Sequence, residues 1–217
     1  MIDLAQIVRG AVNSVPPCGR VRTRARLLPW AGRWAGLIGL LFFLHLPGSA
    51  AGQELVTRDP IKVKAAFLRN FAHYVTWPTN AFADDRSPWS IGILGSDPFG
   101  EVLEKTFKSR TEQGRPFEIF RADTLDKLPS CQIVFVAYKD SAKRRTALTQ
   151  LKNRPVLTVG DAPEFLQEGG IIRFQVGDRV EMSINLDQAR SVSLKIQTKM
   201  LEVSHEVLEN GAVHKRR

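Results

Sequence analysis

Between residues 59 and 208, short apolar runs alternate with segments whose apolar residues recur at helical spacing. The short runs predict strands, and apolar residues three or four positions apart predict helices. The predicted strands cover residues 90–94, 117–121, 131–137, 156–159, 171–175 and 179–184. The predicted helices cover residues 61–75, 100–108, 141–152, 162–167 and 186–208.

Local signals mark where several of these elements begin and end. Asp59 followed by Pro60 is typical of a helix start, and Trp77-Pro78 is expected to end that helix. The Val-Gly-Asp stretch at 176–178, between the last two strands, predicts a β-hairpin. The last predicted helix carries one apolar stripe, formed by Ala189, Val192, Ile196, Met200, Val203 and Val207.

This alternation predicts the α/β fold class. We expect a single domain of the three-layer type, with a largely parallel sheet flanked by helices. A β-hairpin toward the C-terminus and a long final helix complete the expected fold. No linker, repeat or break in composition divides residues 52–217, so the sequence predicts one domain there.

Residues 1–51 have the three-part pattern of a secretory signal. Five arginines between positions 20 and 33 precede an apolar stretch at 35–46, and residues 47–51 supply a helix breaker and small side chains. The pattern predicts a cleaved signal peptide and an exported protein. The apolar stretch of about twelve residues is too short for a bilayer span, which needs roughly twenty. A buried core helix is the alternative interpretation.

Removing residues 1–51 changes the charge of the chain considerably. The full sequence carries +9, but the first 51 residues hold six arginines and one acid, which leaves a net charge of +4. The only basic clusters in the rest are 143–145, interpreted as a solvated helix face, and 215–217, a chain terminus. This mild balance argues against nucleic acid as a partner. Weak contact with anionic lipid or cell wall stays open.

The sequence has two cysteines, Cys18 and Cys131, and only Cys131 follows the predicted signal peptide. The mature chain therefore cannot form an intramolecular disulfide. Cys131 begins an apolar run, where a cysteine usually behaves as a small hydrophobic residue. An intermolecular disulfide or redox role is the other interpretation.

No set of residues forms a complete catalytic or metal site. The turn at 95–100 follows a strand, but Glu101 stands where a phosphate loop needs lysine, so a structural turn is favoured over a nucleotide site. His205-Glu206 begins like a zinc-protease helix, yet Glu209 replaces the second histidine, which favours a solvated helix face. The sequence thus predicts no catalytic residue, no metal ligand, no cofactor and no enzymatic activity.

Aromatic residues are concentrated on the first predicted helix and just after it. A cluster of this kind can anchor a protein partner, since aromatic residues dominate binding hot spots. Burial in the core is the favoured interpretation for most of them. The residues are Phe67, Phe71, Tyr74, Trp77, Trp89 and Phe99.

The order of several motifs resembles a known family. The opening helix at 63–71 runs on to Trp77-Pro78, and a strand at 91–95 is followed by the Asp-Pro-Phe-Gly turn at 97–100. Residues 155–161, Phe165, Gly169-Gly170 and 184–186 resemble the motifs in the second half of that family. In this order and spacing, residues 61–208 are similar to the YfiR-like periplasmic proteins.

The resemblance implies a periplasmic, non-enzymatic repressor of an inner-membrane diguanylate cyclase. Such a repressor binds the periplasmic sensor region of the cyclase, lowers cyclic di-GMP and limits biofilm formation. The resemblance also implies a homodimer. The alternative is a periplasmic module that binds a small ligand or cell wall without a cyclase partner, with the turn at 95–100 as its site.

The positions that define the family are interpreted as markers of the fold rather than as a binding site. Glycine suits tight turns, proline ends a helix, and an asparagine can cap one. The partner-binding surface is therefore left undefined. These positions are Asn70, Trp77, Pro78, Gly95, Pro98, Gly160, Gly169, Gly170 and Asn185.

Overall fold

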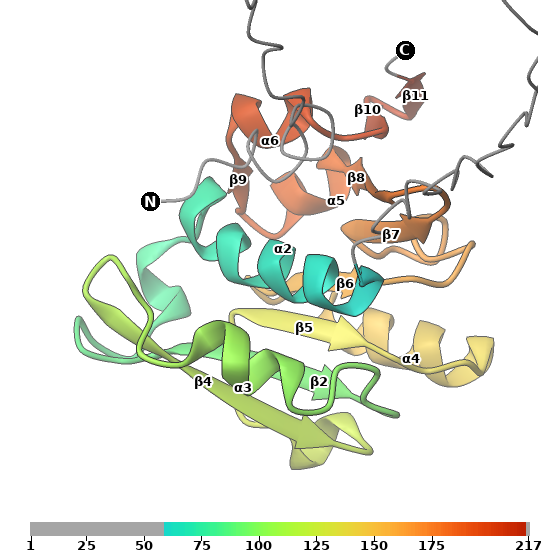
Figure 1. Ribbon diagram of the computed structural model, residues 1–217. Coiled ribbons are helices and arrows are strands. Elements are labelled where there is room, and N and C mark those ends of the chain that lie inside the picture. The colour runs from blue at the N-terminus through green and yellow to red at the C-terminus, as the bar shows by residue number, and fades with distance from the viewer. Residues whose placement is uncertain (1–58, 216–217) are drawn as a thin grey trace, which may run out of the picture. The chain divides into compact units, whose positions relative to one another are not determined.

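The computed structural model describes residues 59–215, so the predicted signal peptide lies outside the described residues. Within them a nine-stranded sheet forms the centre of the fold (Figure 1). In spatial order its strands are β11 (Ala212–Lys215), β10 (Glu206–Glu209), β8 (Val180–Asn185), β7 (Ile172–Val176), β6 (Leu157–Gly160), β5 (Ile133–Val136), β2 (Trp89–Leu94), β4 (Arg115–Ala122) and β3 (Thr111–Glu112). The helices are α2 (Pro60–Tyr74), α3 (Val102–Phe107), α4 (Ser141–Leu151), α5 (Leu186–Ser191) and α6 (Thr198–Glu202), with short 3₁₀ turns η1 (Thr79–Ala81) and η2 (Leu125–Lys127).

The middle of the sheet is parallel. β2 lies between β4 and β5, and β6 and β7 continue the parallel run beyond β5. The predicted hairpin is confirmed, because β7 and β8 are antiparallel and Val176 lies opposite Val180. The α/β class with a largely parallel sheet is therefore confirmed.

Helices cover both faces of this sheet. Side chains of α2 and α3 join one core cluster, together with Phe135 and Phe174 of the sheet. Side chains of α4 join a second cluster on the other face, with Val134 and Phe165. Figure 1 shows α2 and α3 in front of the sheet and α4 behind it. This division follows from right-handed crossovers, since the chain moves in opposite directions along the sheet after β2 and after β5.

Helix α2 begins as its sequence predicts but ends early. The Asp59 carboxylate accepts a hydrogen bond from the N–H of Ile61 at 3.0 Å, and Pro60 is the first helical residue. The helix ends at Tyr74 rather than at Trp77-Pro78. The reason is tertiary: β1 (Val75–Thr76) pairs in antiparallel fashion with β9 (Lys195–Ile196).

The long final helix predicted for residues 186–208 is wrong. Helix α5 stops at Ser191, and Ser193 adopts a left-handed backbone with φ of 60°. The rest of the segment forms β9, α6 and β10, of which β9 pairs with β1 and β10 pairs with β8. The apolar stripe still faces inward, because Ala189, Val192 and Met200 are buried. These strand pairings with distant parts of the chain replace the local helical periodicity.

A second hairpin, β10 and β11, ends the described part of the chain. Asn210 and Gly211 connect the two strands with φ of 55° and 72°, the conformation that short hairpin turns favour. Both carboxylate oxygens of Asp187 accept hydrogen bonds from the N–H groups of these two residues, each at 2.9 Å. The N–H groups of Gly211 and Asn210 lower the pKa of Asp187.

The predicted helix at 162–167 is also wrong, because the segment forms consecutive turns. Phe165 in its middle is completely buried. A Cβ atom on Gly160 or Gly170 would lie 2.5 Å or 2.2 Å from the Phe165 ring. These two glycines therefore make room for the aromatic ring, which holds the turns against the sheet.

The aromatic cluster belongs to the core, as the sequence predicts. The rings of Trp77 and Trp89 are edge to face, with centroids 5.0 Å apart. The indole N–H of Trp77 donates to the carbonyl of Gln132 at 3.2 Å. The Gln132 side chain in turn accepts from the N–H of Ser90 at 2.8 Å and donates to the carbonyl of Ala81 at 2.6 Å. Trp77 thus connects the loop after β1 to the start of β5.

Replacing Trp77 with alanine is expected to lower the free energy of unfolding by about 3–5 kcal/mol, because a large buried ring is lost. Trp77→Phe should cost less, about 1–3 kcal/mol, because it keeps a ring and loses only part of the buried surface and one hydrogen bond. The Gln132 carbonyl would still accept the N–H of Leu157 at 2.9 Å. Urea unfolding of the mature protein measures both. An alanine variant as stable as wild type would contradict the core role of Trp77.

Candidate functional site

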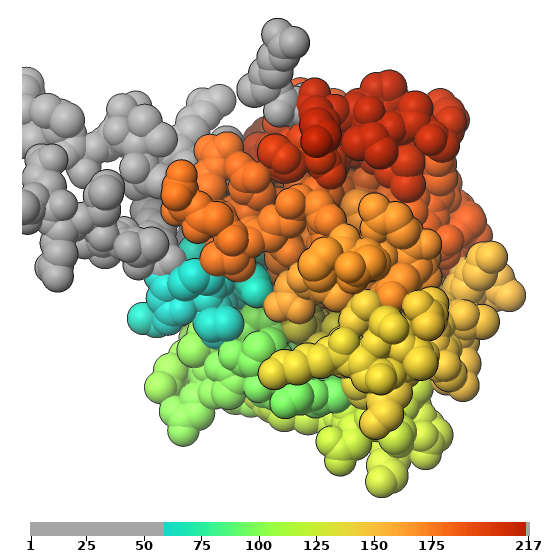
Figure 2. Space-filling view, turned by 90° about the vertical axis from the view of Figure 1, so that its right-hand side faces the viewer, coloured from blue at the N-terminus to red at the C-terminus, as the bar shows by residue number. Residues whose placement is uncertain are grey.

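A cleft of about 920 Å³ opens at the carboxyl ends of the central strands. Residues 96–98 follow β2, residues 137–141 follow β5, and residues 161–164 follow β6; all three segments line it. Figure 2 views the molecule from the side toward which these strands run. After β2 the chain crosses to β4, and it later continues from β5 to β6 on the opposite side. The cleft therefore lies at a topological switch point, where open α/β sheets bind ligands.

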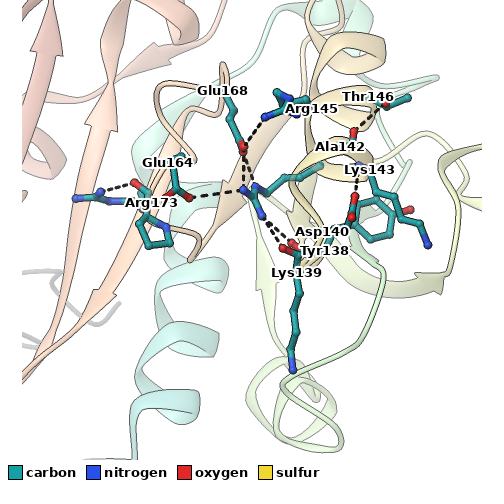
Figure 3. A network of polar contacts seen from close by, with 12 residues as sticks. Tyr138, Lys139, Asp140, Ala142, Lys143, Arg145, Thr146, Glu164, Glu168 and Arg173 are labelled. Atoms are coloured by element: carbon teal, nitrogen blue, oxygen red, sulfur yellow. Dashed lines mark hydrogen bonds and ion pairs between the residues drawn. The ribbon is translucent and has the colours of Figure 1, made fainter.

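Arg144 joins two of the loops that line the cleft. Its side chain is only 4% exposed, and two of its nitrogens contact the Glu168 carboxylate, Nη2 at 2.8 Å from Oε1. Its Nη1 donates to the carbonyls of Tyr138 at 3.1 Å and Lys139 at 3.2 Å. Figure 3 shows Glu164 and Glu168 pointing toward the same guanidinium group. The hydrogen bonds that Arg144 donates to Glu168 raise the pKa of Arg144.

The sequence did not single out this ion pair. The interpretation of residues 143–145 as one solvated helix face is wrong for Arg144, which is buried, while Lys143 and Arg145 are exposed. Arg144 shares its helix face with Ala147, Leu148 and Leu151, which are also buried. The spacing of three, four and seven residues from Arg144 to these apolar positions is the feature of the sequence that indicates burial of the arginine on the inner side of α4. Arg144 is a structural element of the cleft, already held by Glu168.

The turn after β2 has a structural role as well. Asp97 accepts a hydrogen bond from the N–H of Phe99 at 2.7 Å, and Arg121 donates to its other oxygen at 2.7 Å. Arg121 also contacts Glu104 at 2.7 Å, and these two acids raise its pKa, Glu104 most. Gly95 has a left-handed φ of 95°, which favours glycine. The structure thus agrees with the prediction of a tight structural turn.

The cleft contains charges of both signs. Asp161 faces Lys64 of α2, whose Nζ lies 3.0 Å from a carboxylate oxygen and whose side chain is 6% exposed. Glu164 is exposed on the rim, as are Lys139 and Arg145. Phe135, Pro98 and Pro163 add apolar lining. Two of the acids that line the cleft are already paired, Asp161 with Lys64 and Glu168 with Arg144.

The histidine motif near the C-terminus lies on a strand instead of the expected helix. His205 precedes β10, and its Nδ1 is 3.2 Å from Glu181. Glu209 contacts Arg190 at 2.6 Å. Across residues 59–215, no three His, Cys, Asp or Glu side chains lie close enough together to hold a metal ion.

The positions that define the resemblance serve the fold where the structure shows their contacts. Gly95 leaves room for the Tyr138 ring, which would lie 2.8 Å from an added Cβ. Asn185 caps α5, because its side-chain oxygen accepts the N–H of Gln188 at 2.9 Å. Asn70 is 7% exposed, and its side-chain nitrogen has no hydrogen-bond partner among the described residues.

Cys131 is buried at 6% exposure and unpaired, as expected for a small hydrophobic residue. Its thiol lies 3.3 Å from the carbonyl of Pro129. Burial raises the pKa of the Cys131 thiol from 9.0 to about 12. The reactive form of cysteine is the thiolate, so this environment suppresses its chemistry.

Comparison with models of protein families assigns the chain to a family. A family model described as YfiR/HmsC-like matches residues 61–205, and the chain belongs to this family. Members of the YfiR-like family are regulators rather than enzymes. A search of curated proteins finds no match to this chain. No helix within residues 59–215 is long and apolar enough to cross a membrane.

Replacing Arg144 with alanine is expected to lower the free energy of unfolding by about 3–5 kcal/mol, because the buried Glu168 would lose both hydrogen-bonded nitrogens and keep only Arg145, 3.9 Å away. The matched control is Arg145→Ala on the exposed neighbour, whose contact with Glu168 is longer, at 3.9 Å, so this variant should cost no more than about 1 kcal/mol. Urea unfolding measures both. Equal costs for the two variants would show that the buried ion pair has no special role.

The Cys131 thiol is expected to resist a disulfide reagent such as DTNB at about pH 8 in the folded mature protein and to react rapidly in denaturant. The raised pKa also lowers stability between pH 9 and about 12, because the unfolded chain loses the thiol proton first. Cys131→Ala should show a weaker decline over that range. Rapid labelling of the folded protein would contradict the burial of this group.

Proposed function

We propose that this protein is a periplasmic, non-enzymatic regulator that binds the periplasmic sensor region of an inner-membrane diguanylate cyclase and represses it. The observation that carries the proposal is the family match, which spans residues 61–205 and so covers most of the described domain. The secretory pattern of residues 1–51 supports the location. Repression lowers cyclic di-GMP and limits biofilm formation.

Repression of this kind is a shift of population between two states of the cyclase. The regulator binds the inactive state more tightly than the active one, and each tenfold difference in affinity corresponds to about 1.4 kcal/mol. Moving the cyclase from almost fully active to almost fully inactive needs a difference of about 10⁴-fold. A homodimeric regulator would match a two-fold symmetric cyclase, and we include the homodimer in the proposal.

A second candidate is a module that binds a small ligand or a cell-wall fragment without a cyclase partner. The cleft at the ends of β2, β5 and β6 favours it, because its position is one where α/β sheets bind ligands. Muropeptides from the cell wall carry amino and carboxylate groups, and both signs of charge line the cleft. A ligand that binds only the folded state raises the melting temperature.

Deleting the gene is expected to raise cyclic di-GMP in the cell several-fold, because the cyclase loses its repressor. Restoring the full chain should bring the level back, whereas a chain without residues 1–51 should not, since it stays in the cytoplasm. Mass spectrometry of cell extracts measures the nucleotide. An unchanged level on deletion would exclude the cyclase, and a thermal shift with muropeptides would then favour the second candidate.

A further inference from the structure

The strand β4 has a long open edge. β2 pairs with it in parallel along Phe117–Ala122. On its other side, β3 pairs only with Arg115 and Pro116. No other strand within residues 59–215 borders β4, and Figure 1 shows it along the lower margin of the sheet. Open edges of this kind readily pair with another chain.

The direction of the backbone groups follows from the two pairings. The carbonyl of Ala122 accepts the N–H of Gly95 at 2.8 Å, so it points toward the β2 side. Because successive residues of a strand direct their N–H and C=O groups to opposite sides, the groups of Phe117, Ile119 and Arg121 point outward. Arg115 has the same orientation, which agrees with its pairing to Glu112 across β3. The pairing of Thr111 with Pro116, which has no N–H, directs the N–H of Phe117 to the carbonyl of Arg110. The open edge therefore offers the C=O of Phe117 and both backbone groups of Ile119 and Arg121 to an added strand.

A groove accompanies this edge. It has a volume of about 810 Å³ and lies between α3 and the first half of β4. Phe107 of α3 and Phe117 and Ile119 of β4 give it an apolar lining. A strand edge beside a helix, with an apolar groove between them, is suited to an extended peptide whose backbone pairs with the edge and whose alternate side chains enter the groove.

The charges along the groove differ between its ends. At one end Glu101 contacts Lys105 at 3.0 Å, and Glu104 contacts Arg121 at 2.7 Å, so these acids are neutralised. The other end has Lys108 and Arg110, which line the groove and are exposed. Neither cation lies within 4.0 Å of a carboxylate oxygen among the described residues. This end, which lies next to Phe117, therefore attracts an acidic side chain.

We propose that the open edge of β4 takes up an extended segment of the cyclase's periplasmic region as an added strand. The segment has apolar residues facing Phe117 and Ile119 and an acidic residue beside Lys108 and Arg110. This inference rests on the proposed function and names the surface that performs it. The unpaired backbone of the edge specifies an extended partner, and the groove and the two cations specify its side chains.

A second copy of this chain fits the edge less well. Two-fold pairing about Ile119 would place Arg121 of the copy opposite Phe117, next to Lys108 and Arg110. The acids near Arg121 of the copy, Asp97 and Glu104, are already paired with that arginine. The copy would therefore bring no unpaired acid to Lys108 and Arg110. Self-association through β4 is thus an outcome that the experiment must distinguish.

The decisive variant is Ile119→Pro. The lost N–H points outward, so the ladder with β2 keeps its hydrogen bonds while the added strand loses one and meets the proline ring. Affinity of the mature protein for the purified periplasmic region of the cyclase should fall at least about tenfold by calorimetry. Ile119→Val, which keeps the N–H and an apolar side chain, should bind like wild type. In cells, Ile119→Pro should fail to lower cyclic di-GMP.

A second variant, with Lys108→Glu and Arg110→Glu, changes two exposed side chains and leaves the core unaltered. It should also weaken binding at least about tenfold, by repelling the acidic residue of the segment. If Ile119→Pro lowers the melting temperature so far that the protein unfolds, this charge variant tests the proposed surface instead. Wild-type affinity of this charge variant, or of a folded Ile119→Pro, would overturn the proposed surface.

The outcomes separate this inference from the proposed function. If deletion raises cyclic di-GMP and the Ile119→Pro variant still represses, the regulator acts through another surface and only the inference fails. If deletion leaves cyclic di-GMP unchanged, the proposed function fails and the cyclase segment falls with it. If Ile119→Pro abolishes a dimer seen by light scattering while cyclase binding is kept, the edge joins two copies and the inference is overturned.

Discussion

The structure depends on the parallel pairing of β2 with β4 on one side and β5 on the other. All six residues of β2 are buried, because neighbouring strands and helical layers enclose it. Gly92 lies at its centre, where an added Cβ would come within 2.6 Å of the Leu128 side chain and 3.1 Å of the Cys131 sulfur. Close packing of the loop before β5 therefore requires glycine at this position. The two core clusters, the cleft and the open edge of β4 all take their positions from this central strand.

The same central strand separates two surfaces with different properties. At the carboxyl ends of the strands, the cleft combines both signs of charge and is held together by Arg144 and Glu168. Along β4, the backbone itself is the unpaired group, and an apolar groove lies beside it. A small ligand suits the first surface and an extended segment of a protein suits the second. Arg121 of β4 connects the two surfaces, because it contacts Asp97 in the turn after β2 and Glu104 of α3.

Much of the candidate site could be located from the sequence but not understood from it. The sequence favours a structural turn at 95–100 and offers it as a ligand site only for the alternative function, because a strand leads into it and a helix leaves it. The role of Arg144 was missed, since its charge and two basic neighbours suggested solvent exposure, while its partner Glu168 lies 24 residues away. The open edge of β4 was also beyond prediction. Strand order in a sheet depends on which distant segments meet, and no local pattern records it.

Apart from the turns at 162–167, the sequence by itself determined the strands and helices of the parallel half, because each apolar run or helical stripe there is a local property that burial preserves. It also determined the β7–β8 hairpin, the cap of α2 and the placement of Cys131 in the core. Only the tertiary structure decided residues 186–208, whose apolar stripe suits a helix but whose backbone pairs with β1 and β8. Thr76 and Lys195, partners in that pairing, lie more than a hundred residues apart. Contacts over such distances outweigh helical propensity, because they pair backbone groups and bury side chains at the same time.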